Sequence, residues 1–289
     1  MRKSSAFLLV ILLLAVTALA ACGGAKTGDN GAGSGTGTTT PPASGSNTQE
    51  PAAGGLERVK AAGVLKIGID ASYPPMEFVD KDGKTPIGFD VDLAKKIAEK
   101  LGVKAEHVII DWNGIQTGLL SGHYDAIISS MTITEERQKE MDFVEYIRMG
   151  IAFASRNGVE VKTEADLNDK VVVVQAETTA HFYLEELKDL KMKEFKSFPY
   201  ATDAFRELEN GLADVVVIDE PVAGYYAKLD PSKYTVTGTA SLEPDPIGIA
   251  LRKEDTELNK AIAQAVADLK ADGTIKQLSE QWFGGELGQ

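Results

Sequence analysis

The chain has almost no cysteine, since Cys22 is the only one among its 289 residues. No disulfide bond can form within it, so stability must come from the size of the hydrophobic core. Its three histidines show no metal-ligand spacing, and we expect no metal site and no cofactor. A Gly-x-x-x-x-Gly-Lys-Ser/Thr phosphate loop and a Gly-x-Ser-x-Gly nucleophile elbow are both missing, which argues against the functions that depend on them.

Positive charge is also scarce. The net charge is −13, and removal of Arg2 and Lys3 with an N-terminal signal would take it to −15. Such an acidic surface argues against nucleic acid as a partner and against peripheral binding to anionic lipid. It is compatible with an extracytoplasmic protein, and it weakly favours cationic ligands.

Long hydrophobic runs are missing as well. The apolar stretch from Ala6 to Ala18 follows Arg2 and Lys3 but is too short to be a comfortable transmembrane span. It leads into Leu-Ala-Ala-Cys22, which resembles a bacterial lipobox, so residues 1–22 are predicted to be a lipoprotein signal peptide. Lipidation of Cys22 would anchor the protein to a membrane surface. The alternative is an ordinary cleavage site beside an unmodified thiol.

Residues 23–55 contain no aromatic side chain and consist mainly of Gly, Ser, Thr, Pro, Ala and Asn. A segment of this composition cannot bury enough apolar surface to offset its chain entropy. We predict a flexible linker between the lipid anchor and a folded region. The folded region then begins near Leu56 and is long enough for one large domain or two smaller lobes.

The rest of the chain alternates strand-like and helical segments. Four consecutive valines before Gln175, and the run from Ala213 to Ile218, predict strands that are buried on both faces. The alternation predicts an α/β fold with mostly parallel sheets, in two similar runs on either side of Gly150. The helix N-caps predicted from residue type are Asp90, Thr134 and Thr202.

Ligands of open α/β sheets bind beyond the carboxyl ends of the strands. That rule selects the polar loops at Asp70–Tyr73, Asp111–Trp112, Ser129–Thr132, Gln175–Thr179 and Asp219. The third loop is rich in hydroxyl groups and leads to Arg137, whose planar fork of donors fits a carboxylate. The residues predicted to hold a carboxylate are therefore Ser130, Thr132 and Arg137, and Ser129 beside them is a further predicted ligand-binding residue.

A zwitterionic ligand also needs an acceptor for its ammonium group. Asp219 and Asp70 each end a hydrophobic strand and could accept an ammonium or a cationic side chain. Thr178 and Thr179 begin a helix, whose free N–H groups add to an anion site. Large aromatic residues in polar loops more often cover a ligand than fill a core, and here they are Tyr73 and Trp112.

These segments together form a recognisable pattern. The most specific one reads Asp125-Ala-Ile-Ile-Ser-Ser130-Met-Thr132-Ile-Thr134-x-x-Arg137. The supporting ones are Asp70-x-x-Tyr73-x-Pro75, Gly88-Phe89-Asp90-Val-Asp-Leu93, Gln175-x-x-Thr178-Thr179, Asp214…Asp219-Glu220 and Asp272-Gly273-Thr274…Trp282-Phe283. From Leu56 to Phe283 the chain thus resembles the family 3 extracellular solute-binding proteins, the polar amino-acid receptors of ABC importers.

The resemblance implies two α/β lobes joined by two hinge strands, which is the type II periplasmic binding protein fold. Lobe 1 would comprise residues 56–148 and 248–289, and lobe 2 would comprise residues 149–247. In that family the residue matched by Arg137 grips the ligand carboxylate, and the residue matched by Asp219 takes the ammonium. The matched positions that share these contacts or line the side-chain pocket are Ser130, Thr132, Thr178, Thr179, Asp70, Tyr73 and Trp112.

The implied protein is a monomeric, lipid-anchored, extracytoplasmic receptor rather than an enzyme. It would deliver a polar amino acid to the permease subunits of an ABC importer. Asp70 and Glu177 tilt the expected ligand towards a basic amino acid, while glutamine and cystine remain open. The alternatives are a dehydratase or lyase on the same scaffold, with Glu177 as its general acid, and a ligand sensor acting through a membrane partner.

Two features depart from the family pattern. Many relatives have glycine where this chain has Glu177, just before the predicted anion-binding turn. The usual Pro-Tyr before the first crossing strand is absent around Tyr146–Met149. The position of the hinge boundary is therefore defined only to within several residues.

Overall fold

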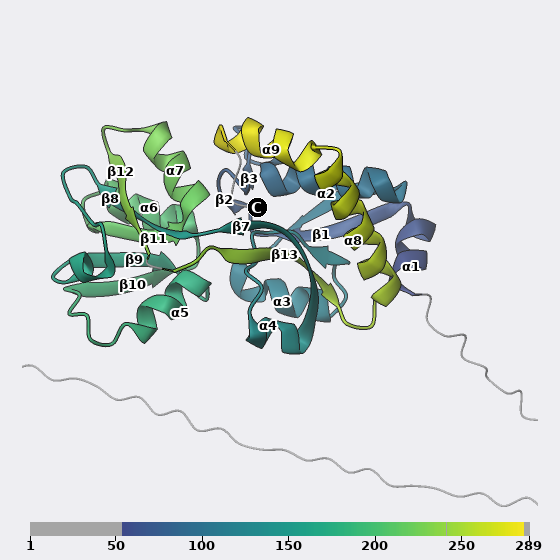
Figure 1. Ribbon diagram of the computed structural model, residues 1–289, viewed down its shortest axis with the longest axis horizontal. Coiled ribbons are helices and arrows are strands. Elements are labelled where there is room, and N and C mark those ends of the chain that lie inside the picture. Colours follow the sequence, from purple (N-terminus) through teal and green to yellow (C-terminus); the bar gives the residue numbers. More distant parts are fainter. Residues whose placement is uncertain (1–53, 241, 286–289) are drawn as a thin grey trace, which may run out of the picture. The chain divides into compact units, whose positions relative to one another are not determined.

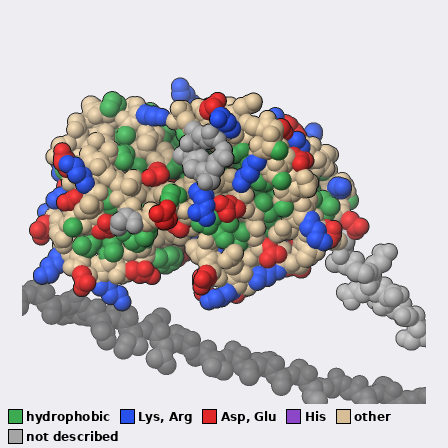
Figure 2. Space-filling model, in the orientation of Figure 1, with side chains coloured by type: hydrophobic (Ala, Val, Ile, Leu, Met, Phe, Trp, Pro, Cys, Tyr) green, Lys and Arg blue, Asp and Glu red, His purple; other side chains and the backbone are tan. Residues whose placement is uncertain are grey.

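The computed structural model describes residues 54–240 and 242–285 (Figure 1). The predicted signal peptide and Cys22 lie outside the described residues, as does all of the predicted linker except its last two positions. None of the helices within the described ranges is long and apolar enough to cross a membrane. Lys and Arg side chains lie among Asp and Glu on the visible face and do not gather into one basic patch (Figure 2).

The first five-stranded sheet contains strands from both ends of the described chain. Its order is β5 (Lys104–Ile109), β1 (Val64–Ile69), β6 (Ala126–Ile127), β13 (Asp245–Arg252) and β7 (Met141–Met149). Helices cover both of its faces in Figure 1. On one face lie α1 (Gly55–Ala62), α2 (Phe89–Leu101), α8 (Thr256–Ala271) and α9 (Thr274–Phe283), and on the other lie α3 (Trp112–Leu120) and α4 (Glu135–Glu140).

The second five-stranded sheet comes from the middle of the chain. Its order is β10 (Glu194–Phe198), β9 (Val171–Gln175), β11 (Val215–Asp219), β8 (Ile151–Arg156) and β12 (Tyr234–Thr239). The predicted burial of both faces of the valine-rich strands is confirmed, since every residue of β9 and β11 is buried. The helices of this part are α5 (Thr179–Glu186), α6 (Ala201–Glu209), α7 (Glu220–Leu229) and the 3-10 helix Glu164–Leu167.

A small antiparallel sheet lies beside the first one. It consists of β2 (Ser72–Tyr73), β3 (Glu77–Val79) and β4 (Pro86–Ile87). Gly88 follows β4 with φ +134°, and a Cβ there would lie 2.2 Å from the backbone oxygen of Met76. Only glycine fits this approach, which holds β3 against the start of α2.

The chain crosses between the two large sheets twice. It leaves the first sheet at Met149 and enters the second at Ile151, with Gly150 between them. A Cβ at Gly150 would lie 2.8 to 3.0 Å from the carboxylate of Glu220, so a larger residue at the crossing would require that side chain to shift. The return runs from Thr239 to Asp245. Two α/β lobes joined by two strand segments are the predicted fold class, and it is confirmed.

The prediction of mostly parallel sheets is wrong. Each large sheet has two parallel and two antiparallel pairings. The antiparallel ones all involve β7, β8, β12 and β13, the strands next to the crossings. These strands are not followed by a helix that returns the chain to the same sheet edge, which a parallel neighbour would require.

Two predicted helix caps are also wrong. Helix α2 begins after Gly88, and the Asp90 carboxylate accepts a hydrogen bond from Ser130 N instead of capping the helix. Helix α6 begins after Tyr200, so Thr202 lies within its first turn. The predicted cap at Thr134 is confirmed, because its hydroxyl accepts a hydrogen bond from Arg137 N.

Candidate functional site

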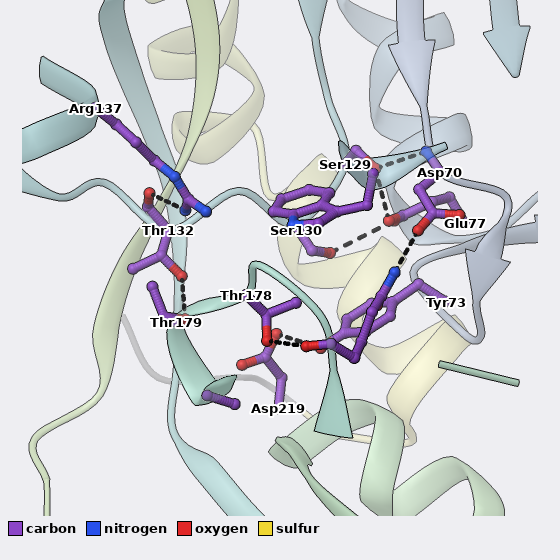
Figure 3. Close-up of a pocket in the computed structure, with 13 residues that line it drawn as sticks. Asp70, Tyr73, Glu77, Ser129, Ser130, Thr132, Arg137, Thr178, Thr179 and Asp219 are labelled. Atoms are coloured by element: carbon purple, nitrogen blue, oxygen red, sulfur yellow. Dashed lines mark hydrogen bonds between the residues drawn. The ribbon is translucent and has the colours of Figure 1, made fainter. Parts of the chain in front are cut away.

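All ten residues predicted to bind a ligand line one pocket between the two lobes (Figure 3). Most of them follow the carboxyl ends of strands in the two large sheets, as the strand-end rule requires, whereas Tyr73 lies on β2 and Arg137 on α4. The full lining comprises Asp70, Tyr73, Glu77, Trp112, Ser129, Ser130, Thr132, Arg137, Gln175, Thr178, Thr179, Ala180 and Asp219. In the view of Figure 3, Arg137 lies at one end of the pocket, and Asp70 and Glu77 lie at the other.

Arg137 is a buried cation without a carboxylate partner among the described residues. Helix α4 holds it in place, and its side chain is only 7% exposed. Its Nη1 donates to the Thr132 carbonyl at 2.9 Å, and its guanidinium carbon lies 5.4 Å from the centroid of the Trp112 ring. Burial lowers the pKa of Arg137 to about 10, so the group still carries its charge at neutral pH. Such a group can hold an anionic ligand with charge-assisted hydrogen bonds.

Asp219 is the matching buried carboxylate from the other lobe. It ends β11, and its Oδ2 accepts a hydrogen bond of 2.8 Å from the Tyr73 hydroxyl. Burial raises the pKa of Asp219 to about 7, against the opposing effects of the Tyr73 hydrogen bond and the Arg137 charge. Although Asp219 occupies the N-cap position of α7, its side chain makes no capping hydrogen bond, so the carboxylate is directed to the pocket.

In the hydroxyl loop after β6, residues 129–132, some side chains already form hydrogen bonds with neighbouring protein groups. Ser129 Oγ accepts from Asp70 N and donates to Glu77 Oε1, both at 2.9 Å. Strand β6 ends at Ile127, and Ser130 has φ +51°, where the chain turns away from the sheet. Thr132 Oγ1 lies 3.2 Å from Thr179 Oγ1 in the opposite lobe.

Thr178 and Thr179, at the start of α5, make different contacts. The Thr178 hydroxyl accepts from His181 N and donates to the Gln175 carbonyl, so it caps the helix. The Thr179 hydroxyl meets Thr132 instead. The helix itself ends at Glu186.

Four hydrogen bonds cross directly between the lobes at this pocket. Each joins a residue of the first sheet's lobe to one of the second. The pairs are Tyr73 with Asp219, Gln175 with Asp70, Trp112 with the Glu177 carbonyl, and Thr132 with Thr179. Burial also raises the pKa of Asp70, whose carboxylate accepts from Gln175 Nε2 at 2.7 Å.

Sequence reasoning missed two polar residues of the lining. Gln175 ends β9, and although the strand-end rule selected the loop that it begins, it was not predicted to contact the ligand. Glu77 gave no such signal, because it lies in a short extended piece between apolar neighbours. In the structure it is 1% exposed and contacts Ser129 and Ser130.

Glu177 takes a different place from the one its sequence position suggested. Its side chain is exposed and lines a larger hollow at the mouth of the pocket, which shares Arg137 and Thr179 with it. Its φ of +60° lies in the left-handed region that glycine adopts most readily. This backbone geometry explains why glycine would suit the position. Among the described residues, no group of three His, Cys, Asp or Glu side chains is arranged to hold a metal ion.

Two hinged α/β lobes with opposite charges facing one pocket define a type II periplasmic-type binding protein. The chain belongs to the bacterial extracellular solute-binding proteins, family 3, whose model matches residues 65–285.

Curated relatives and solved structures agree with this family. The L-cystine-binding protein TcyJ of Escherichia coli is 33% identical over 235 residues, which cover 80% of this chain and 87% of that protein. ABC transporter arginine-binding protein 1 of the same species is 31% identical, covering 77% of this chain and 92% of that protein.

Among solved structures, an ancestral arginine-binding protein bound to arginine is 40% identical to this chain, with a TM-score of 0.72. The match covers 77% of this chain and 99% of that protein's chain. AncCDT-1, an ancestral amino acid-binding protein described as a precursor of cyclohexadienyl dehydratase, is 38% identical. It covers 79% of this chain and 99% of its own, with a TM-score of 0.72.

Proposed function

We propose that this protein binds a polar amino acid between its lobes and delivers it to the permease of an ABC importer. One observation carries the proposal: the pocket holds a buried cation, Arg137, and a buried carboxylate, Asp219, from opposite lobes. An α-carboxylate and an α-ammonium would complement these two groups. The names of the relatives, which include cystine- and arginine-binding proteins, support the same ligand class.

A basic amino acid fits the rest of the pocket best. Asp70 and Glu77 lie at the end away from Arg137, and neither forms an ion pair with Lys, Arg or His among the described residues (Figure 3). A guanidinium or ammonium group on the ligand side chain would bring the missing positive charge. Glutamine would have to satisfy these carboxyl groups with a neutral amide, whereas the second half of cystine would bring an ammonium group together with a further carboxylate.

Binding requires the lobes to move apart. The enclosed space of the pocket is about 20 Å³, which is room for about one water molecule. An amino acid can therefore enter only when the lobes separate, which opens the four hydrogen bonds at the pocket and also the bonds from Tyr200 to Asp111 and from Lys228 to the Phe283 carbonyl. Contacts from both lobes to one ligand would then shift a hinge equilibrium towards the closed form. The crossings at Gly150 and between Thr239 and Asp245 supply the hinge, so we propose lobe boundaries there, close to the predicted 148/149 and 247/248.

A thermal-shift screen of the purified protein against the twenty amino acids, followed by isothermal titration of the hits, tests this function. We expect the largest stabilisation from arginine or lysine. A ligand at 100 times its dissociation constant stabilises the folded protein by about 2.7 kcal/mol, a shift that such a screen detects. If none of the twenty amino acids raises the melting temperature or produces heat, the proposal is wrong.

We also propose that the mature protein is an extracytoplasmic lipoprotein attached through Cys22. The support is the sequence alone: a basic start, an apolar run and Leu-Ala-Ala before the only cysteine. Substitution Cys22→Ser should move the expressed protein from the membrane fraction to the soluble fraction. The linker substitution Ser34→Ala should leave it in the membrane fraction. Equal membrane association of wild type and Cys22→Ser would rule out the anchor.

We do not propose a dehydratase or lyase for this chain. That alternative needs Glu177 as a general acid, and the Glu177 side chain lines the mouth rather than the pocket itself. The likeness to AncCDT-1 is a likeness to a protein described as amino acid-binding.

A further inference from the structure

Two buried carboxyl groups lie together behind the hydroxyl loop, and only one of them reaches the pocket. Glu77 on β3 lines the pocket, and Asp90 at the start of α2 lies beneath it. Glu77 is 1% exposed and Asp90 is 0% exposed. Ser130 connects them, because its Oγ lies 3.4 Å from Glu77 Oε2 and 3.3 Å from Asp90 Oδ2. One hydroxyl hydrogen can serve only one of these oxygens at a time.

The hydrogen bonds around Asp90 require one further proton. Its Oδ2 accepts from Ser130 N at 2.7 Å and from the Tyr146 hydroxyl at 2.9 Å. Its buried Oδ1 has no hydrogen-bond donor among the described residues when both carboxyl groups are ionised. A buried acceptor without a partner is costly. A proton on Glu77 gives the pair a further donor, since the two carboxyl groups lie close enough to share a hydrogen bond.

No positive charge compensates this pair. The titratable groups that face Glu77 are Asp70 after β1, Tyr73 on β2, Asp90 on α2 and Tyr146 on β7. Within the described ranges neither carboxyl group forms an ion pair. Burial, followed by the Asp90 charge, raises the pKa of Glu77 well above its usual range. Arg137, the cation of the same pocket, contacts Thr132 and Trp112 instead.

We propose that Glu77 holds a proton in the unliganded protein and releases it to solvent when a bound amino acid brings a positively charged side chain into the pocket. This inference rests on the proposed function. Glu77 would then determine specificity by charge. A ligand with a cationic side chain replaces the proton on Glu77, whereas a ligand with a neutral side chain leaves the proton in place.

The exchange has a defined pH signature. A ligand that binds the ionised form of a group gains affinity as pH rises, by up to about tenfold per pH unit for one released proton. Asp219 contributes to every amino acid alike, because its pKa of about 7 means that an α-ammonium displaces a fraction of a proton near neutral pH. The difference between a cationic and a neutral ligand therefore isolates Glu77.

Isothermal titration of the wild-type protein with L-arginine and with L-glutamine, at about pH 7 in phosphate and in Tris, measures the protons released per bound ligand. The two buffers differ in ionisation enthalpy, so the change in observed heat gives the proton count. We expect L-arginine to release about one proton more than L-glutamine. Equal release by the two ligands would overturn the inference while leaving amino-acid binding intact. Binding of L-glutamine alone would also overturn it, and binding of neither would overturn the proposed function as well.

The variant Glu77→Gln assigns the proton to this residue. Its amide can still donate a hydrogen bond to the Asp90 side chain but has no proton to release. We expect the excess release with L-arginine to disappear and its affinity to fall by roughly 10- to 100-fold, with L-glutamine affected less than about threefold. The exposed glutamate variant Glu106→Gln serves as the control and should match the wild type. An unchanged excess release in Glu77→Gln would exclude Glu77. If this variant does not fold, the wild-type comparison still decides.

Discussion

Replacing Arg137 with alanine is expected to weaken amino-acid binding by roughly 100- to 1000-fold. The guanidinium group is the only basic group in the pocket lining, and it is almost fully buried. Removing it leaves the ligand carboxylate in a desolvated site beside Asp219, with no charge to balance it. The loss of one partner of a buried charged pair typically costs 2 to 5 kcal/mol or more, which sets this range.

Lysine at the same position separates charge from geometry. The variant Arg137→Lys keeps the positive charge but loses the planar fork and the stacking over Trp112. We expect it to bind about tenfold more tightly than Arg137→Ala and still less tightly than the wild type. Isothermal titration measures all three affinities. The exposed Arg206, which pairs with Asp203, provides the control variant Arg206→Ala, which should bind normally.

Loss of Arg137 also affects the unliganded protein, so folding must be checked. The Thr132 carbonyl would lose its hydrogen-bond donor at 2.9 Å, and the Trp112 ring would lose its contact with the guanidinium group. Circular dichroism and a thermal melt distinguish this structural effect from a loss of ligand contact. Wild-type affinity in a folded Arg137→Ala protein would contradict the carboxylate role.

Asp219→Asn is the second substitution with a large expected effect, a fall in affinity of roughly 100-fold. The amide has nearly the same shape and its oxygen can still accept from the Tyr73 hydroxyl, so the contact between the lobes is kept. The α-ammonium group loses its counter-charge. The control variant is Asp203→Asn, which changes a half-buried aspartate outside the pocket in the same lobe.

The pH dependence gives a second and independent measurement of the same role. An α-ammonium prefers the ionised carboxylate, and burial raises the pKa of Asp219 to about 7. Binding of a neutral amino acid should therefore strengthen as pH rises towards 7 and level off above it. The Asp219→Asn variant should lose this dependence, because its side chain does not titrate. A pH profile unchanged by the substitution would assign the ammonium to another group.

Much of this organisation could be read from the order of residues. Strand and helix alternation predicted the α/β class, and the strand-end rule selected loops that the structure gathers around one pocket. These features could be predicted because they depend on contacts between residues close in sequence. Thr134 caps the helix that carries Arg137, and Thr178 caps α5, each through a residue only three positions away.

The errors occurred where distant segments meet. Asp90 has the residue type of an N-cap, yet its carboxylate serves Ser130 and Tyr146, which lie 40 and 56 residues further along the chain. The mixed strand directions depend on the crossings at Gly150 and before Asp245, which no local pattern specifies. Glu77 was missed for the same reason, since its partners Ser129 and Ser130 are far from it in sequence.

The sequence by itself determined which chemical groups are available: hydroxyls and Arg137 after one strand, Thr178 and Thr179 at a helix start, and Asp219 after another strand. The residue types and the local backbone are enough to place these groups at the ends of their strands and helices. Only the tertiary structure decided which groups meet, because the pairs that join the lobes, such as Tyr73 with Asp219, are separated by up to 146 residues. It also buried Glu77 against Asp90, where desolvation raises the pKa of this glutamate well above its usual range.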